Sequence, residues 1–419
     1  MPSYRPRPAA RRERVTLTSV NRILLAKGLR AFGDGFVSLL LPAYLLELGF
    51  TPLQVGVVAT TTLLGSGVLT LCVGLQAWRF HYRTWLLAAT LLMTGTGLGF
   101  ALVTDFWPLL VLALVGTLNP SSGDVSVFLP LEQSLLSHVV EDKRRTWVMA
   151  RYSLVGSFLA AFGSLAAALP AMATASAHVS TRSALQGMFV LYALLACAAG
   201  AVYRGLPKAQ ASDPPQPRAA LNTSRRKVYT LAALFSLDAF GGGFVVQSLV
   251  ALWLYQRFGL SISAASAIFF WTGALTALSY LVAARIAGRI GLLKTMVFTH
   301  LPSSVCLILI PFMPQPGYAI ALLLVRSALS QMDVPTRSSY VMAIVPPEER
   351  AAAASVTSVP RSLAAASSPL LAGYLLGVST FGWPLIAAGA LKIVYDLLLL
   401  ARFGGGSIHR NVRPPPPIQ

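Results

Sequence analysis

Charged side chains are scarce in this sequence, and acidic ones are the scarcest. Only 11% of the 419 residues are Asp, Glu, Lys or Arg, and 55% are hydrophobic. A soluble globular domain holds about a quarter charged residues. A chain with so little charge cannot cover a surface that faces water. The composition therefore excludes an ordinary soluble protein and indicates an all-α polytopic membrane protein.

Cysteine and histidine are also rare, and neither forms a motif. The three cysteines, Cys72, Cys197 and Cys306, lie inside apolar segments without the spacing of a zinc site or a disulfide framework. The sequence has no HExxH, no GxSxG and no Gly-Lys-Thr ending of a phosphate loop. We therefore expect no enzyme, no cofactor and no metal site. We also expect no cleavable signal peptide, because the first apolar segment is too long for an h-region.

The positive charge is unevenly placed along the chain. The 33 lysines and arginines outnumber the 14 acidic residues, and most of them fall in the ends of the chain and in alternate loops. This is the positive-inside pattern of membrane proteins rather than the basic patch of a nucleic-acid-binding protein. We expect a multi-pass protein of the cell (inner) membrane with both termini cytoplasmic, surrounded by membrane lipid and without a nucleic-acid partner.

Long apolar segments predict about twelve membrane-spanning helices in two bundles of about six. The expected units are a basic cytoplasmic tail, a first bundle, a Pro-rich cytoplasmic linker, a second bundle and a C-terminal tail, at residues 1–22, 23–203, 204–227, 228–403 and 404–419. Prolines at 120 and 130 should kink the fourth helix. The seventh helix, 228–255, and the tenth, 321–345, are each expected as one span.

The two halves repeat at an offset of roughly 210 residues, the internal symmetry typical of transporters. Phe32-Gly33-Asp34-Gly35-Phe36 matches Phe240-Gly241-Gly242-Gly243-Phe244. Asp124 matches Asp333, Arg151 matches Arg361, and Gly163 matches Gly373. Matching charges in matching spans indicate a duplication.

These features resemble the major facilitator superfamily over essentially the whole chain. Basic turns stand where that family has its G-x-x-x-D-R-x-G-R-R motif, with Arg79 in the first copy and Arg289 in the second, although both copies lack the Asp. The Gly-Pro motif of the drug antiporters is absent from 156–163. The resemblance implies a monomer of two rocking halves. It also implies a central cavity lined by helices 1, 4, 7 and 10, with helices 5 and 11 acting as gates.

Acidic and basic side chains occur deep in the four helices that would line the cavity. Asp34 lies roughly 16 Å along its helix from residue 23, near mid-membrane. Burial raises the pKa of a carboxyl and a neighbouring arginine lowers it, so such pairs could couple transport to protons. The alternative is a fixed structural ion pair. The candidates for substrate or proton coupling are Arg30, Asp34, Asp124, Asp238, Arg326, Asp333 and Arg337.

The tenth segment carries the densest set of these charges. On one continuous helix Arg326, Asp333 and Arg337 would lie on a single stripe with Ser330 between them. Its arginines could bind an anionic substrate through paired hydrogen bonds, or they could be neutralised by Asp333.

A second set of charges is expected to act in gating, and a third to pair locally. The family positions and the basic turns suggest gate roles, and these fall on Arg79, Glu132, Arg151, Arg289 and Arg361. Glu132 is expected to pair with the basic turns. Lys392 and Asp396 are four residues apart on the twelfth helix and are expected to form a local ion pair.

These observations favour a secondary active transporter that moves a small solute by alternating access. We expect H⁺ as the coupling ion and export of a small organic molecule, with an organic anion among the candidates. The alternatives are proton-coupled uptake of a polar nutrient and a non-transporting membrane sensor. A sensor should have lost the deep charges, which this chain retains.

Overall fold

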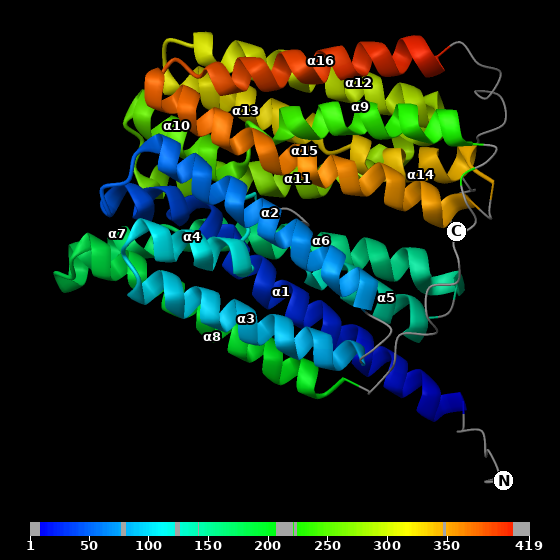
Figure 1. Cartoon of the computed structure of the whole chain (residues 1–419), viewed down its shortest axis with the longest axis horizontal. Helices are drawn as coiled ribbons and strands as arrows, with labels where there is room; N and C mark the ends of the chain where they lie inside the picture. The colour runs from blue at the N-terminus through cyan, green and yellow to red at the C-terminus, as the bar shows by residue number, and fades with distance from the viewer. Residues whose placement is uncertain are drawn as a thin grey trace.

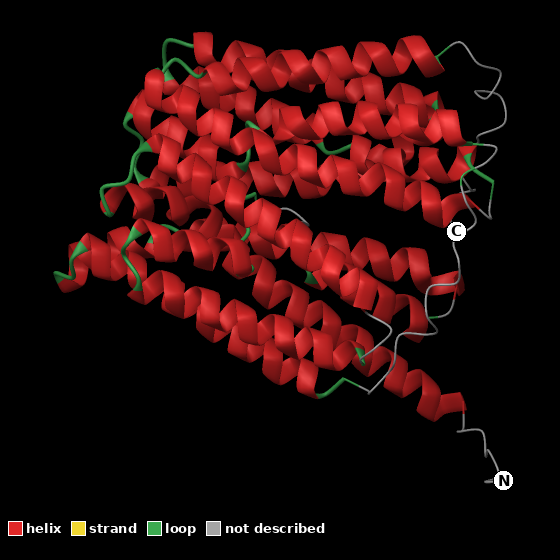
Figure 2. Ribbon diagram, in the orientation of Figure 1, coloured by secondary structure: helices red, strands yellow, loops and turns green. Residues whose placement is uncertain are grey.

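The computed structural model describes residues 9–76, 81–121, 126–140, 142–206, 221, 224–346 and 349–404, and the regular elements in these ranges are helices (Figure 2). Nine segments of the described chain are long and apolar enough to cross a membrane. The pairs α4–α5 and α13–α14 and the helix α15 occupy the positions of the other expected spans. This arrangement is consistent with about twelve spans.

The first half of the chain contains eight helices, several of which are parts of one span. They are α1 (Ala9–Glu47), α2 (Pro52–Gln76), α3 (Tyr82–Leu102), α4 (Phe106–Val115), α5 (Phe128–Val139), α6 (Asp142–Ala166), α7 (Leu169–Ala177) and α8 (Thr181–Arg204). Residues 9–22, expected as a tail, are therefore the start of α1.

The second half repeats this plan. It contains α9 (Arg225–Gly243), α10 (Gln247–Phe258), α11 (Ile262–Ile290), α12 (Leu292–Leu309), the 3₁₀ turn η2 (Ile310–Phe312), α13 (Pro316–Ser330), α14 (Asp333–Ile344), α15 (Arg350–Val378) and α16 (Trp383–Phe403).

Two spans that we expected to be continuous are broken. The seventh span divides between α9 and α10, directly after Gly241-Gly242-Gly243, because consecutive glycines have low helix propensity. The tenth divides between Ser330 and Asp333. Pro335 has no N–H to donate to the carbonyl of Gln331, which weakens the helix at this point. The fourth span, expected to be kinked by its prolines, is divided between α4 and α5.

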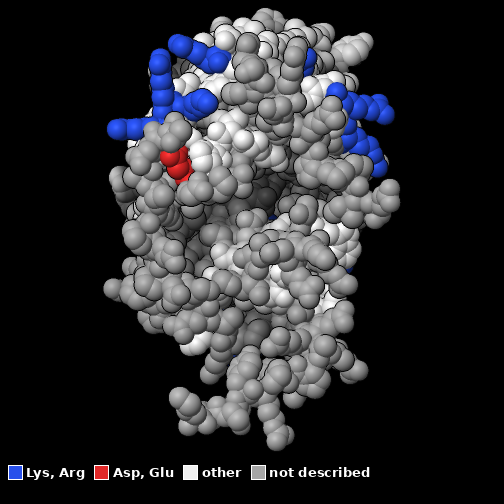
Figure 3. Space-filling model, turned by 90° about the vertical axis from the view of Figure 1, so that its right-hand side faces the viewer, with Lys and Arg blue, Asp and Glu red and all other residues white. Residues whose placement is uncertain are grey.

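The two halves form neighbouring bundles that meet mainly along two helix pairs (Figure 1). Helix α2 packs against α15, and α6 packs against α11. We call the end of the molecule where α1 begins and α16 ends the base, and the opposite end the apex. Figure 3 views the base and shows a hollow between the two halves.

Contacts between the halves close the molecule on the apex side of this hollow. The Tyr255 hydroxyl donates to the Leu39 carbonyl at 3.3 Å, and the Ser248 N–H donates to the Pro120 carbonyl at 3.1 Å. A Cβ added at Gly56 of α2 would lie 2.8 Å from the Cα of Gly373 on α15, so the two backbones nearly touch. The hollow therefore opens toward the base alone in the part of the chain that the structure describes.

Candidate functional site

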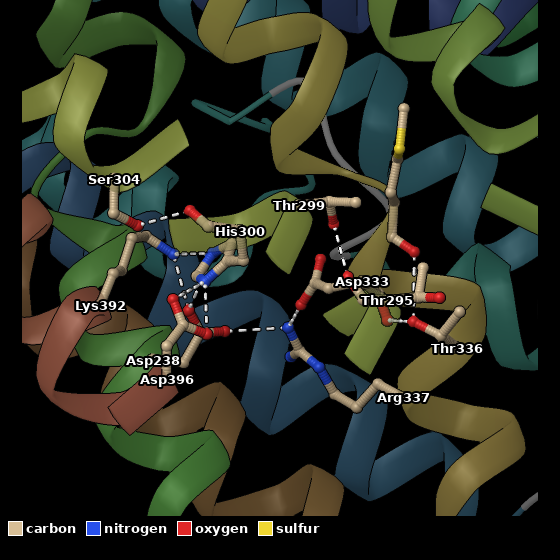
Figure 4. Close-up of polar contacts among 11 residues, drawn as sticks. Asp238, Thr295, Thr299, His300, Ser304, Asp333, Thr336, Arg337, Lys392 and Asp396 are labelled. Carbon is tan, nitrogen blue, oxygen red and sulfur yellow. Dashed lines mark hydrogen bonds and ion pairs between the residues drawn. The ribbon is translucent and has the colours of Figure 1, made fainter. Parts of the chain in front are cut away.

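Asp238 of α9 is the centre of a buried charge network in the second half (Figure 4). Its carboxylate accepts from Nη2 of Arg337 at 2.9 Å and from Nζ of Lys392 at 2.7 Å. Nε2 of His300 lies 3.6 Å away. These partners come from α14, α16 and α12, so one carboxylate connects four helices.

The network extends from Asp238 in two directions. His300 contacts Asp396 through Nδ1 at 2.9 Å, and Arg337 makes a second ion pair with Asp333, four residues earlier on α14. Nζ of Lys392 also lies 3.5 Å from Nε2 of His300. Both Asp333 and Asp396 are buried. Figure 4 shows Asp238 bridging the His300 side of the network and the Arg337 side.

The depth of this network makes it costly unless its charges are paired. At 1.5 Å per residue Asp238 lies about 20 Å along α9 from the base. Charges at membrane depth face a protein interior or a wet cavity and pair with one another. Removing one partner of a buried pair leaves an uncompensated charge, so each group here depends on the others.

Arg361 of α15 approaches the same network from a different side. It is half-buried and lies close enough to Arg337, Asp238, Asp333 and Tyr395 to interact electrostatically with each of them. Its strongest interaction is with Arg337, which carries the same charge. In the described part of the chain the Nε atoms of both arginines and the Tyr395 hydroxyl are buried without a hydrogen-bond partner.

The first half contains a smaller buried cluster around Glu132 of α5. Glu132 forms an ion pair with Arg30 of α1. It also accepts hydrogen bonds from the hydroxyls of Tyr152 at 2.6 Å and Tyr203 at 2.5 Å. The guanidinium of Arg30 stacks 3.9 Å from the ring centre of Phe128. We expected Glu132 to pair with the basic turns, but the structure pairs it with Arg30 of α1.

Of the other sequence-predicted residues that the structure describes, Asp34 lies close enough to Arg30 of the Glu132 cluster to interact with it electrostatically. Asp34 is half-buried and accepts a hydrogen bond from the Tyr192 hydroxyl at 3.4 Å. Arg151 is exposed and lies 4.6 Å from the ring centre of Trp147, and Arg289 is exposed near the end of α11. Asp124 and Arg79 lie outside the described residues.

Arg326 does not share a stripe with Asp333 and Arg337. The break between α13 and α14 changes the rotation of one segment relative to the other, and Arg326 lies near Cys306 of α12. The structure thus brings together two of the three residues that a continuous helix would have aligned.

The sequence analysis did not single out His300. Lys392 and Asp396 interact electrostatically, as expected, but their close ion-pair contacts are to other residues, since Lys392 contacts Asp238 and Asp396 contacts His300. A signal was present in the ninth span, where Thr295, Thr299 and Ser303 place polar groups at four-residue spacing next to His300.

Comparison with known proteins identifies the family of the chain. The model of the Major Facilitator Superfamily matches residues 23–325 and 231–418. An uncharacterised membrane protein of Saccharomyces cerevisiae is 23% identical over 415 residues, which cover 90% of this chain and 92% of the yeast protein.

Solved transporters share the fold at low sequence identity. The nucleoside transporter NupG superposes with a TM-score of 0.70 at 14% identity, covering 92% of this chain and 99% of NupG. A bacterial homologue of the human lysosomal transporter Spinster, in an inward-facing and occupied conformation, gives 0.69 at 15% identity, covering 91% and 94%. The human organic anion transporter MFSD10 gives 0.63 at 16% identity, covering 94% and 100%. The chain belongs to the major facilitator superfamily and is a membrane transporter rather than an enzyme.

Proposed function

We propose that this protein is a proton-coupled secondary transporter of a small organic solute, with the Asp238 network as its coupling site. The observation that carries the proposal is the set of contacts to Asp238, which Arg337, Lys392 and His300 approach from three helices. A carboxylate held by several separate elements responds to any motion among them.

The coupling follows from how burial and charge act on a proton site. Cations lie beside Asp238 and Asp333 at this depth and balance their charges. When solute binding or rocking draws Arg337 away, a carboxylate that loses its cation gains affinity for a proton. By linkage, proton binding then changes the affinity for the solute by the same factor. A solute that binds together with the proton is transported in the same direction as the proton. A solute that competes with the proton is exchanged for it, and this exchange is what proton-driven export requires.

The position of the hollow supports an inward-facing state. Exposed basic residues gather at the base, where lysine and arginine side chains project (Figure 3). They are Arg204, Arg225, Arg226, Lys227, Arg285, Arg289, Lys294 and Arg402. Exposed arginines at the apex are Arg182 and Arg257. The positive-inside rule places the base in the cytoplasm, so the hollow faces inward.

The proposal is tested by transport into liposomes. The solute is first identified by a thermal-shift screen of organic anions, organic cations, neutral sugars and drug-like compounds. A ligand at about 100 times its dissociation constant should stabilise the protein by roughly 2.7 kcal/mol. In liposomes with an enclosed pH dye, we expect this solute to cause proton movement that Asp238→Asn abolishes.

The matched control is Asp105→Asn, which removes a carboxylate from an exposed apical turn. It should leave solute-dependent proton movement unchanged. Solute flux that proceeds in Asp238→Asn with unaltered proton movement would contradict the proposal.

A further inference from the structure

Three polar groups of the second half converge without an acceptor among the described residues. They are Nε of Arg337, Nε of Arg361 and the hydroxyl of Tyr395, and each is buried. Electrostatic interactions connect all three, so they lie close together although they come from α14, α15 and α16. Unmet buried donors and two facing guanidinium groups are each unfavourable.

The aromatic surroundings give this place a defined shape. The ring of Phe235 lies 5.3 Å from the guanidinium carbon of Arg337, and the rings of Phe235 and Tyr395 are 6.4 Å apart in an edge-to-face arrangement. Arg337 and Tyr395 are buried, while Arg361 retains partial exposure. The place therefore has an inner wall of packed aromatic rings and one arginine that remains partly exposed.

We propose that Arg337, Arg361 and Tyr395 together bind the carboxylate of a small monovalent organic acid. The proposal rests on the transport function proposed above and names its substrate class. Guanidinium groups bind carboxylates through charge-assisted, geometrically matched hydrogen bonds, and a phenolic hydroxyl supplies a further donor. An anion here would also separate the like charges of Arg337 and Arg361.

The charges around the site favour a monovalent anion that binds together with one proton. The carboxylates of Asp238, Asp333 and Asp396 are balanced by Arg337, Lys392 and Arg361 when His300 is neutral. One bound anion leaves one uncompensated negative charge at membrane depth, and one proton on His300 or on a carboxylate restores the balance. Anion and proton therefore bind together, which favours co-transport over exchange.

Equilibrium binding to the purified full-length protein in detergent tests the site. The probes are monocarboxylates from acetate to benzoate and indole-3-acetate, each compared with its uncharged amide. We expect at least one acid, and no amide, to raise the unfolding temperature. Arg361→Gln should lower the affinity for that acid about 10- to 100-fold, and Tyr395→Phe about 2- to 10-fold. Arg361→Lys should retain part of the affinity.

Two controls show where the site lies. Arg285→Gln removes the same charge from the exposed surface of α11 and should leave the affinity unchanged. Arg151→Gln alters the matching position in the first half. Loss of binding in Arg151→Gln but not in Arg361→Gln would overturn the assignment, and so would a panel in which no acid stabilises the wild type.

Binding of a proton together with the acid is tested by measuring the affinity for the acid between pH 5.5 and 7.5, where the acid stays ionised. Uptake of one proton should tighten binding by about tenfold for each unit of falling pH. An affinity independent of pH would refute co-binding. If instead a neutral or cationic solute moves with protons in an Asp238-dependent and Arg361-independent way, the transport function stands and the anion site fails.

Discussion

Glu132 shows, at the scale of single residues, how the chain keeps a carboxylate inside a membrane bundle. Tyrosine hydroxyls donate to both of its oxygens, and Arg30 supplies the balancing charge. Arg30 in turn donates through Nε to the Tyr203 hydroxyl at 3.1 Å. Each group of the cluster therefore provides a hydrogen-bond or charge partner for another, and removing one of them leaves its partners uncompensated.

Replacing Glu132 with Leu should destabilise the protein by about 3–5 kcal/mol, because Arg30 then remains buried without its counter-charge. Arg30→Leu should cost a similar amount. The double variant should cost clearly less than the sum of the single variants, since both charges leave together. Unfolding by heat or denaturant in detergent measures all three. Additive losses would show that the two side chains do not act as a pair.

The sequence allowed Asp238, Asp333 and Arg337 to be proposed as one functional set, and the structure does connect them. Charged residues deep in an apolar segment can be located directly from the order of residues in the sequence. The identity of their partners is not, because Lys392 reaches Asp238 across 154 positions of the chain. Arg326 was placed wrongly for a related reason, since its direction depends on a helix break rather than on its spacing.

At the scale of helices, breaks recur in three of the four spans that the family resemblance assigns to the central cavity. The fourth, seventh and tenth spans all divide, at α4–α5, α9–α10 and α13–α14. Prolines predicted a kink in the fourth span, where the structure has a break, whereas the glycine run at 241–243 and Pro335 were not recognised as interruptions. Broken helices beside a transport site give separate segments that can turn independently.

Close packing of α2 on α15 should control the closure of the apex. A Cβ at Gly56 would lie 2.6 Å from the Pro369 carbonyl, so Gly56→Val should push these helices apart and shift the population toward an open apex. Spin labels at Thr51 and Thr380 would report longer distances by double electron–electron resonance. Gly67→Val, on the same helix with open space around its Cβ, is the control. Equal distances in both variants would contradict this role.

At the scale of the whole molecule, sequence reasoning predicted the architecture better than the site. The all-helical fold, the repeat and the family were all recognisable from hydropathy, charge placement and matched residues, and the structure and the family match confirm them. These properties are averages over many residues. The site depends instead on a few side chains from distant segments, and their contacts arise only when the bundle packs.

Membrane orientation gives a prediction for the complete molecule. With the native cysteines replaced by alanine, His178→Cys at the apex should react with a membrane-impermeant maleimide added to intact cells, and Arg289→Cys at the base should not. Both positions are exposed in the structure. The expected result follows from the excess of basic residues at the base. Reversed labelling would place the base, and the hollow with it, outside the cell.

The long reach of Asp238 also has a consequence for how the protein is made. Arg337 is synthesised 99 residues after Asp238 and Lys392 154 residues after it. During insertion α9 therefore enters the bilayer before either cation exists. A nascent chain stalled before α16 would retain an incompletely neutralised aspartate in hydrocarbon, which marks it for chaperone binding or degradation. The final helix thus acts as a checkpoint for assembly of the second half.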